Sequence, residues 1–455
     1  MRALWCKSQS SLLFRHPREQ RHTIPAYFYP FFRIFVKNHR KVDSNVKTQD
    51  RSQFYIDRED RYGAHNYHPL PVVLERGEGV FMWDVNGKKY YDFLSSYSAI
   101  NQGHCHPRII NALQRQSEKL TLTSRAFHNN LLGECEEFLS KLFGYDKVLM
   151  MNSGVEAVET AMKLVRKWAY KVKKIEENKA ITVFANGNFH GRTIGVISAS
   201  TDPSSNLGFG PYLRGVLNVP YNDVDALETV FISNPNIAGF IVEPIQGEAG
   251  VVVPDEGYFR KVADLCKKYN VLFVADEIQT GIGRTGKLLA TQYENVRPDI
   301  IVLGKALSGG VLPVSAVLAD DEIMLTIKPG EHGSTFGGNP LACAVTMEAL
   351  NVVIDESLVE NAYEMGNLFR EKINDYIKKS TILKMVRGKG LLNAIVVNSD
   401  EDSSLGWDIC MKLRDNGLLA KPTHGNKIRL APPLVINERQ MLSAIDIITT
   451  TLDSF

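Results

Sequence analysis

The chain has 455 residues, of which 44% are hydrophobic and 23% charged, with six scattered cysteines. This length predicts two or more domains, and the composition is that of an ordinary soluble globular protein. No apolar stretch reaches the ~20 residues of a membrane-spanning helix, and no Cys-x-x-Cys pair indicates a zinc site or a disulfide framework. We therefore expect no membrane insertion, no metal centre and a reducing compartment.

The positive charge is concentrated at the N-terminus. Residues 1–42 hold nine lysines or arginines and one acid, a net charge of +8, while the whole chain has +2. An Arg-rich, Ser-containing, acid-poor leader is typical of a transit peptide, here for import into the mitochondrial matrix. The alternative is a basic arm that binds nucleic acid or an anionic membrane. The acidic remainder has no basic stripe, which argues against nucleic acid as a partner.

An N-terminal segment with a small β meander is expected over residues 43–96. It begins with a polar lead-in over residues 43–53, and turn residues make residues 62–71 irregular. The expected strands cover residues 72–74, 80–84 and 89–93. Val85-Asn86-Gly87 joins the last two as a hairpin turn.

Helical stretches alternate with short apolar runs over residues 97–342. This alternation predicts an α/β fold whose large domain has a mainly parallel sheet flanked by helices. The expected strands are residues 148–151, 181–184, 239–242, 271–275 and 300–303. The alternation stops near Pro340, and residues 343–455 are expected to form a smaller α+β domain.

Lys305 follows the most apolar of these runs, after Gly304 and before the Gly309-Gly310 pair. Ligands of open α/β sheets bind at the carboxyl ends of strands, and glycines let the backbone approach a ligand closely. Partial desolvation there would lower the pKa of the lysine and make it a nucleophile. The alternative is an exposed loop lysine beside a strand.

Two further motifs are expected at the same edge of the sheet as Lys305. Ser153-Gly154-Val155-Glu156 matches a capping box, which leaves the amides of Gly154 and Val155 at the positive end of a helix and suits a phosphate. Asp276 follows the strand over residues 271–275 and lies 29 residues before Lys305, about one strand–helix–strand unit. It is a structural cap or ion-pair partner on one interpretation, and a functional carboxylate on the other.

Pyridoxal 5′-phosphate fits this combination of groups. They are a lysine, an aspartate and the phosphate-binding N-terminus of a helix, all at one edge of the sheet. The lysine would bond the cofactor covalently, and the aspartate would pair with the protonated ring nitrogen. Phe189 lies in a loop after residues 181–184. An aromatic residue there is more often part of a core, but beside the lysine, the aspartate and the phosphate site it is a candidate to stack on the cofactor ring.

From about residue 54 to residue 455, the chain resembles class III pyridoxal-phosphate-dependent aminotransferases of fold type I. The strings that carry the resemblance are residues 62–71, 93–99, 121–125, 242–250, 332–340 and 419–425. The resemblance implies that the smaller domain combines the N-terminal segment with the C-terminal region. His190 departs from the tryptophan expected in the most similar members, although many class III enzymes resemble this sequence there.

The resemblance also implies roles for individual residues. Those assigned to the cofactor are Lys305 for the covalent bond, Asp276 for the ring nitrogen, Gln279 for the ring hydroxyl, Phe189 for stacking, Gly154 and Val155 for the phosphate, and Thr335 of a partner subunit, also for the phosphate. Those assigned to the substrate are Tyr67, Tyr97 and Arg192, with Glu248 and Arg429 as a pair that opens and closes. A homodimer or larger homo-oligomer follows from the shared site.

The activity implied is transfer of the δ-amino group of L-ornithine to 2-oxoglutarate, giving glutamate 5-semialdehyde, which cyclises to pyrroline-5-carboxylate, and glutamate. Three alternatives remain open. The first is a related aminotransferase on N-acetylornithine or 4-aminobutyrate, and the second is an aminomutase on the same fold. The third is a non-catalytic protein that retains the fold. Tyr67 and Tyr97 together favour free ornithine, whose α-amino and carboxylate groups lie at the far end.

Overall fold

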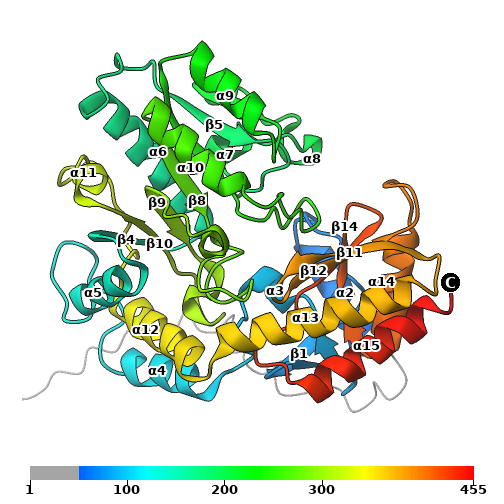
Figure 1. The fold of residues 1–455 in the computed structure, drawn as a ribbon. Helices are drawn as coiled ribbons and strands as arrows, with labels where there is room; N and C mark the ends of the chain where they lie inside the picture. The colour runs from blue at the N-terminus through cyan, green and yellow to red at the C-terminus, as the bar shows by residue number, and fades with distance from the viewer. Residues whose placement is uncertain (1–50) are drawn as a thin grey trace, which may run out of the picture.

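The structure is a computed structural model that describes residues 51–455, so the predicted leader lies outside the described residues. A seven-stranded sheet forms the centre of the larger lobe (Figure 1). Its strands, in spatial order, are β4 (Lys147–Met151), β10 (Ser315–Ala319), β9 (Ile300–Leu303), β8 (Leu272–Asp276), β7 (Ile237–Val242), β5 (Ile181–Ala185) and β6 (Val216–Val219). The strands from β9 to β6 are parallel, and β10 is antiparallel to both of its neighbours. The predicted fold class, α/β with a mainly parallel sheet, is confirmed.

Both faces of this sheet are buried, because successive side chains of a strand point to opposite faces. Phe240 and Phe273 pack on one face with residues of α10 (Tyr258–Tyr269). Ile241 and Val274 pack on the other face with residues of α6 (Gly154–Lys171). This double burial explains why the central strands are continuous apolar runs in the sequence and were predictable from it.

Two smaller sheets complete the structure. The first has the order β1 (Leu74–Glu78), β2 (Phe81–Asp84), β3 (Lys89–Asp92) and β13 (Leu418–Leu419), so the C-terminal region adds a strand to the N-terminal meander. The second has the order β11 (Leu383–Lys389), β12 (Leu392–Val397), β15 (Lys427–Leu430) and β14 (Lys421–Thr423). The smaller domain thus combines both ends of the described chain, as the fold class predicts.

The helices cover these sheets or pack on one another. In the larger lobe they include α4 (Pro107–Ser117), α5 (Leu132–Phe143), α7 (Ile194–Ile197), α8 (Pro203–Asn206), α9 (Val224–Ser233), α11 (Asp321–Met324) and α12 (Pro340–Asp355). The C-terminal helices are α13 (Leu358–Ile377), α14 (Leu405–Asp415) and α15 (Glu438–Leu452), and short 3-10 helices are η1 (Ala290–Glu294) and η2 (Lys305–Ser308). The turn labelled α3 (Ser95–Ser98) has left-handed backbone angles at all four residues.

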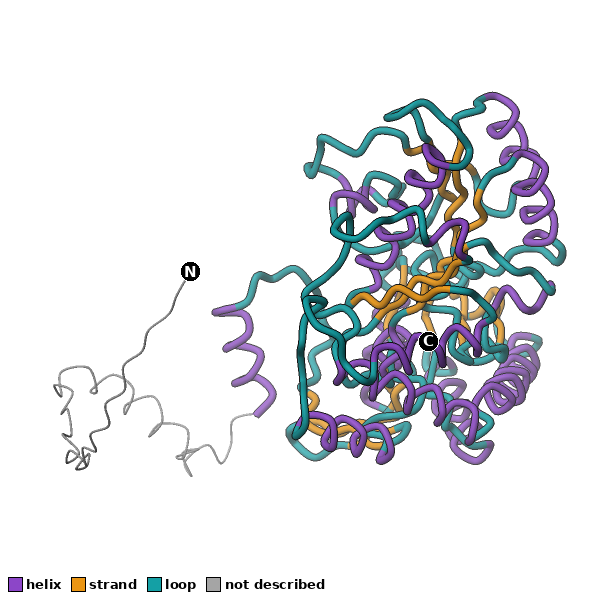
Figure 2. The backbone as a smooth tube through the Cα atoms, turned by 90° about the vertical axis from the view of Figure 1, so that its left-hand side faces the viewer, coloured by secondary structure: helices purple, strands orange, loops and turns teal. Residues whose placement is uncertain are grey.

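Some local predictions were wrong. Residues 51–53 are not a loose lead-in but the start of α2 (Arg51–Tyr62). The first turn of α2 bonds the turn between β2 and β3, and the remainder of the helix extends away from the body of the molecule (Figure 2). Its side chains are mostly exposed, so it has no apolar period for the sequence to show. The first strand of the meander is Leu74–Glu78 instead of residues 72–74, because this exposed edge strand is mostly polar. The strands β6 and β10 were not predicted.

Candidate active site

Three neighbouring parallel strands bring their carboxyl ends to one edge of the large sheet. Asp276 is the last residue of β8, Glu243 follows β7, and Lys305 follows β9 after one glycine. In the ladder Asp276 pairs with Val302, so the carboxylate and the lysine come from adjacent strands. The predicted juxtaposition of Asp276 and Lys305 is confirmed.

A cavity of about 230 Å³ lies at this edge. Its lining consists of Gly154, Val155, Phe189, His190, Gly191, Glu243, Ile245, Asp276, Ile278, Gln279 and Lys305. Six residues predicted to bind the cofactor therefore meet around one space, although they are spread over about 150 residues of sequence.

The backbone and environment of Lys305 are unusual. Its φ angle is 46°, in the left-handed region that a non-glycine residue adopts at a cost and that is found at functional sites. Burial lowers the pKa of Lys305 to about 8, and the nearby positive charge of Arg429 lowers it as well. The amine is therefore closer to its neutral, nucleophilic form at physiological pH than an exposed lysine is.

Asp276 is buried and hydrogen-bonded on both oxygens. His190 Nδ1 donates to Asp276 Oδ2 over 2.6 Å, and the backbone amide of Ile278 donates to Oδ1 over 3.1 Å. Burial alone would lower the pKa of His190, but the hydrogen bond and the charge of Asp276 outweigh this effect and raise it. The histidine therefore orients the carboxylate through this hydrogen bond.

Glu243 is a site residue that sequence reasoning missed. It is buried, lines the cavity, and accepts a hydrogen bond from the Phe189 amide over 2.9 Å. Burial raises the pKa of Glu243 to about 7, although the charge of His190 opposes this shift. The rule that drew attention to Asp276, a carboxylate directly after a buried strand, also applies to Glu243 after β7.

The predicted capping box is present at the start of α6. Ser153 Oγ accepts a hydrogen bond from the Glu156 amide, and Glu156 Oε2 accepts one from the Ser153 amide over 2.7 Å. The first-turn amides of Gly154 and Val155 have no acceptor within the helix and border the cavity. They form an anion site at the positive end of an 18-residue helix.

Glu248 and Arg429 form an ion pair near the cavity. Arg429 Nη1 donates to Glu248 Oε1 over 2.9 Å, and the guanidinium lies 5.2 Å from the centre of the Tyr97 ring. Arg429 is only 1% exposed, whereas the Glu248 side chain is 28% exposed. Burial would raise the pKa of Glu248, but the guanidinium lowers it to about 2. The carboxylate therefore stays charged and masks the arginine.

The backbone around Glu248 is held by hydrogen bonds, although glycines lie on both sides of it at positions 247 and 250. Gln246 and Val252 exchange two backbone hydrogen bonds of 3.1 and 2.9 Å across the turn. A Cβ on Gly247 would lie 1.6 Å from the Gln279 side chain, so this glycine permits close packing. The backbone of this turn is thus fixed, which leaves the Glu248 side chain as the part that could rotate.

Six predicted residues do not line the cavity within one chain. Tyr97, Glu248 and Arg429 form the cluster just described, and the other three are Tyr67, Arg192 and Thr335. Tyr67 is exposed, although its hydroxyl lies close enough to Tyr97 to contribute, after burial and Glu248, to the raised pKa of Tyr97. Arg192 donates to Ser205 Oγ over 2.9 Å, and its guanidinium lies 5.3 Å from the centre of the Phe189 ring. Thr335 is exposed.

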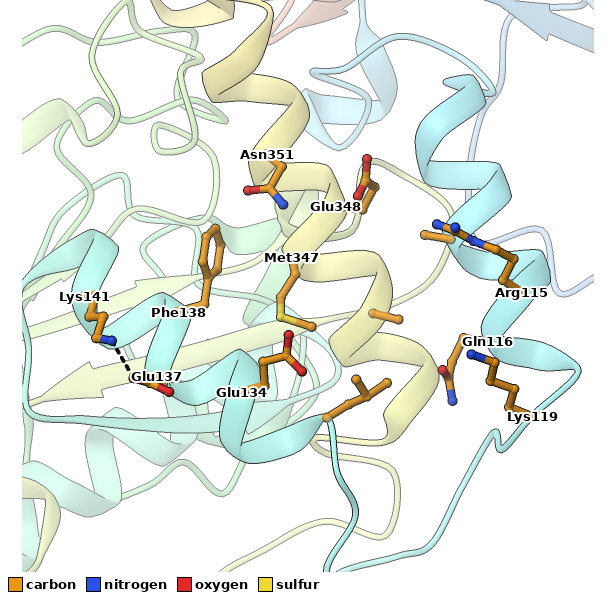
Figure 3. Close-up of a pocket in the computed structure, with 13 residues that line it drawn as sticks. Arg115, Gln116, Lys119, Glu134, Glu137, Phe138, Lys141, Met347, Glu348 and Asn351 are labelled. Carbon is orange, nitrogen blue, oxygen red and sulfur yellow. Dashed lines mark hydrogen bonds and ion pairs between the residues drawn. The ribbon is translucent and has the colours of Figure 1, made fainter.

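A second groove, of about 580 Å³, lies between α4, α5 and α12 (Figure 3). Charges of both signs surround it, including Arg115, Lys119 and Glu134, and Lys141 is paired with Glu137. It lies away from the strand ends and contains neither a lysine–carboxylate pair at a strand end nor a helix N-terminus with a capping box.

Among residues 51–455, no cluster of His, Cys, Asp or Glu has the form of a metal site. No helix in that range is long and apolar enough to cross a bilayer.

Comparison with known proteins gives the family. The model of the family described as "Aminotransferase class-III" matches residues 62–452. The chain belongs to the class III aminotransferases.

Individual relatives are similar over most of their length. A Drosophila melanogaster protein named "Ornithine aminotransferase, mitochondrial" is 61% identical over 410 residues, which cover 90% of this chain and 94% of the fly protein. The crystal structure of the ornithine aminotransferase from Toxoplasma gondii has a TM-score of 0.87 and 47% identity, covering 90% of this chain and 96% of that one. The structure of an acetylornithine aminotransferase from Elizabethkingia anophelis has a TM-score of 0.83 and 58% identity, covering 90% of this chain and all of that one.

The residues around the cavity fit pyridoxal 5′-phosphate, the cofactor of this class. The first-turn amides of α6 suit its phosphate, Asp276 suits its ring nitrogen, and Lys305 suits its aldehyde. Gln279 Oε1 is buried and has no hydrogen-bond partner among residues 51–455, so this amide is available to a polar ring substituent. The Phe189 ring borders the same cavity.

Proposed function

We propose that this protein transfers the δ-amino group of L-ornithine to 2-oxoglutarate, forming glutamate 5-semialdehyde and glutamate. The observation that carries the proposal is the Glu248–Arg429 ion pair near a lysine with a lowered pKa. An arginine that can be masked or exposed lets one site accept two substrates that differ in charge beside the reacting atom.

The cofactor-binding roles follow from the lining of the cavity. Lys305 would bond pyridoxal phosphate covalently, and the Asp276 carboxylate, held in orientation by His190, would keep the ring nitrogen protonated. Gln279 would bond the ring hydroxyl, and Phe189 would stack on the ring. These assignments are supported by the presence of all five residues around one space.

The chemistry that pyridoxal phosphate supplies when bound is a protonated ring that accepts an electron pair from the carbon beside the amine. Lys305 would be displaced from the cofactor by the substrate amine. The freed Nζ could then take the proton from that carbon and deliver it to the carbon on the other side of the nitrogen. A pKa near 8 suits this role, because the amine both accepts and releases a proton near neutral pH.

The ion pair explains the choice between the two substrates. Ornithine has an uncharged carbon next to its δ-amine, so it reacts while Glu248 masks Arg429. In 2-oxoglutarate a carboxylate lies directly beside the ketone. Rotation of Glu248 then frees Arg429 to bind that carboxylate through two parallel hydrogen bonds.

Tyr67 and Tyr97 are proposed to bind the far end of ornithine, with Arg192 at the mouth of the site. A site built for the free α-amino group discriminates against N-acetylornithine, in which this group is blocked. The structural similarity to an acetylornithine aminotransferase nevertheless makes N-acetylornithine the second candidate substrate. 4-Aminobutyrate and an aminomutase reaction are further alternatives.

A side-by-side assay of the purified holoenzyme with ornithine, N-acetylornithine and 4-aminobutyrate tests the proposal. We expect ornithine to be preferred in kcat/KM by ~100-fold or more, since a polar site rejects ligands that leave its groups unpaired. Consumption of ornithine should require 2-oxoglutarate. Equal or faster reaction of N-acetylornithine would reassign the substrate, and ornithine turnover without 2-oxoglutarate would indicate an aminomutase.

Assembly and location are also proposals. We propose a homodimer in which Thr335 of one subunit bonds the phosphate in the other, because this exposed residue does not line the cavity of its own chain.

We propose the mitochondrial matrix as the compartment, with residues 1–42 as the transit peptide. The basic leader and the fly relative named as mitochondrial support it. Domain boundaries after residues 42, 96 and 342 remain predictions.

A further inference from the structure

Arg284 is a fully buried arginine outside the cavity, in the loop that follows β8. Its guanidinium makes four hydrogen bonds, all to uncharged acceptors. Nε and Nη2 donate to Asn101 Oδ1 over 3.1 and 2.7 Å, and Nη1 donates to the carbonyls of Leu391 and Pro432 over 2.9 and 2.6 Å. Among residues 51–455 it has no ion-pair partner.

These acceptors belong to three segments that surround the substrate end of the site. Asn101 lies four residues after Tyr97. Pro432 lies three residues after Arg429. Leu391 directly precedes β12, whose residue Ala394 is the ladder partner of Arg429. One guanidinium therefore ties together the segments that carry Tyr97 and Arg429.

Other hydrogen bonds connect the same segments. The Leu434 amide donates to the Asn101 carbonyl over 2.8 Å, and Asn101 Nδ2 donates to the Ile282 carbonyl over 2.8 Å. The Leu391 amide donates to the Arg284 carbonyl over 3.0 Å. The cluster is continuous, with Arg284 at its centre.

A fully buried arginine whose hydrogen-bond acceptors are all uncharged carries a large desolvation cost. Burial lowers the pKa of Arg284 to about 9, although the charge of Asp92 opposes this shift. Removing a buried charge from water costs several kcal/mol unless hydrogen bonds compensate. A planar fork with five donors can satisfy acceptors on three segments at fixed angles, whereas a lysine presents one compact ammonium.

We propose that Arg284 is a positioning residue for substrate selection, which fixes Arg429 relative to Tyr97 and thereby sets recognition of the carboxylate beside the reacting carbon. The proposal rests on the proposed function of the Glu248–Arg429 pair. Arg284 acts through Arg429, so its loss should affect the 2-oxoglutarate half-reaction more than the ornithine half-reaction.

The test is single-turnover spectroscopy of both half-reactions in holoenzyme carrying Arg284→Lys or Arg284→Gln. We expect the 2-oxoglutarate half to slow by about tenfold or more, with a raised half-saturation concentration, because displacement of a binding group by about 1 Å can cost this much. The ornithine half should change by less than about threefold. Arg297→Gln is the control, since Arg297 also donates to a backbone carbonyl, that of Gly144, but bonds no residue of this cluster and pairs with Asp320 instead. It should leave both halves unchanged.

A double-mutant cycle separates positioning from general stabilisation. In an Arg429→Ala background, Arg284→Lys should have little further effect on the 2-oxoglutarate half. Equal slowing of both halves, or the same fold-loss with and without Arg429, would overturn the proposal. If Arg284→Gln does not fold, the lysine variant decides alone, and loss of folding in both variants would show that Arg284 is structural. If ornithine is not a substrate, the proposed function fails, while the cycle can still be run with glutamate and 2-oxoglutarate.

Discussion

Lys305 combines a left-handed backbone with a lowered pKa, and both are consequences of its position directly after a buried strand. Its amine should be protonated and unreactive well below pH 8 and neutral above it. The rate at which the apoenzyme takes up pyridoxal phosphate should therefore rise with pH and level off above about 8.

This rate can be measured from the absorbance of the bound cofactor, with borohydride reduction and peptide mapping to identify the modified lysine. Lys305→Ala should fold but show no covalent labelling and almost no turnover. An inflection near the ordinary lysine pKa of about 10.4 would contradict the lowered pKa. Labelling of another lysine would refute the assignment.

Residues at strand ends were predictable, whereas contacts between loops were not. Asp276 and Lys305 follow long apolar runs, so the strand-end rule located both. The contact of His190 with Asp276 joins a loop after β5 to the end of β8, and nothing in the spacing of 86 residues indicates it. The burial of Arg284 could not be predicted, because the sequence around a buried loop arginine does not differ from that around an exposed one.

The turn over residues 246–252 is held by the smaller domain as well as by its own hydrogen bonds. Arg387, in β11, donates from Nε and Nη2 to the Gly250 carbonyl over 2.9 and 2.7 Å. These two hydrogen bonds from Arg387 help to keep Glu248 opposite Arg429. Arg429 lies on β15, which belongs to the same sheet as β11.

Arg387→Met should loosen this turn without removing any residue of the proposed site. Hydrogen bonds from a charged group contribute ~1.5–3 kcal/mol, so a measurable fall in the free energy of unfolding is expected. Amides 247–251 should exchange faster, and the ratio of glutamate to ornithine turnover should rise as Arg429 is masked less well. Arg166→Met is the control, since Arg166 also donates to a carbonyl, that of Arg214, on the outer surface. Unchanged exchange and an unchanged ratio would show that the hydrogen bonds from Arg387 are dispensable.

Whole elements were predictable where burial is complete on both faces. The runs that became β5, β7, β8 and β9 are largely apolar, and their strands lie inside the sheet. The edge strand β1 is polar, and its register shifts next to Leu74, so its bounds were wrong. The strand β10 is rich in small residues and runs antiparallel to its neighbours. The alternation of strands and helices predicts parallel strands only, so β10 was missed.

At the scale of the whole molecule, several large apolar side chains are exposed, including Phe336 next to Thr335 in the sequence and Tyr67 in the N-terminal segment. Phe336 is 56% exposed, Phe127 75% and Tyr67 76%. Apolar side chains that gather in one exposed patch mark an interaction surface. The proposed homodimer would bring Thr335 to the cofactor of its partner.

Mixed dimers test this arrangement. Thr335→Ala should weaken cofactor binding by ~1.5–3 kcal/mol, the contribution of a hydrogen bond to a charged group. A dimer of one Thr335→Ala subunit and one Lys305→Ala subunit should regain a single intact site, with wild-type cofactor affinity. No recovery on mixing would place Thr335 in its own subunit's site, and a fully active monomer in sedimentation would refute the shared site.

The account as a whole depends on Arg429 being needed by one substrate and masked for the other. Single-turnover absorbance measurements on Arg429→Ala follow the two half-reactions separately. Loss of one partner of a desolvated charge pair costs ~2–5 kcal/mol, so the 2-oxoglutarate half should slow by at least ~30-fold while the ornithine half is spared. Glu248→Ala should instead admit α-amino acids such as glutamate more readily. Equal slowing of both halves by Arg429→Ala would show that the arginine is structural and would contradict the account.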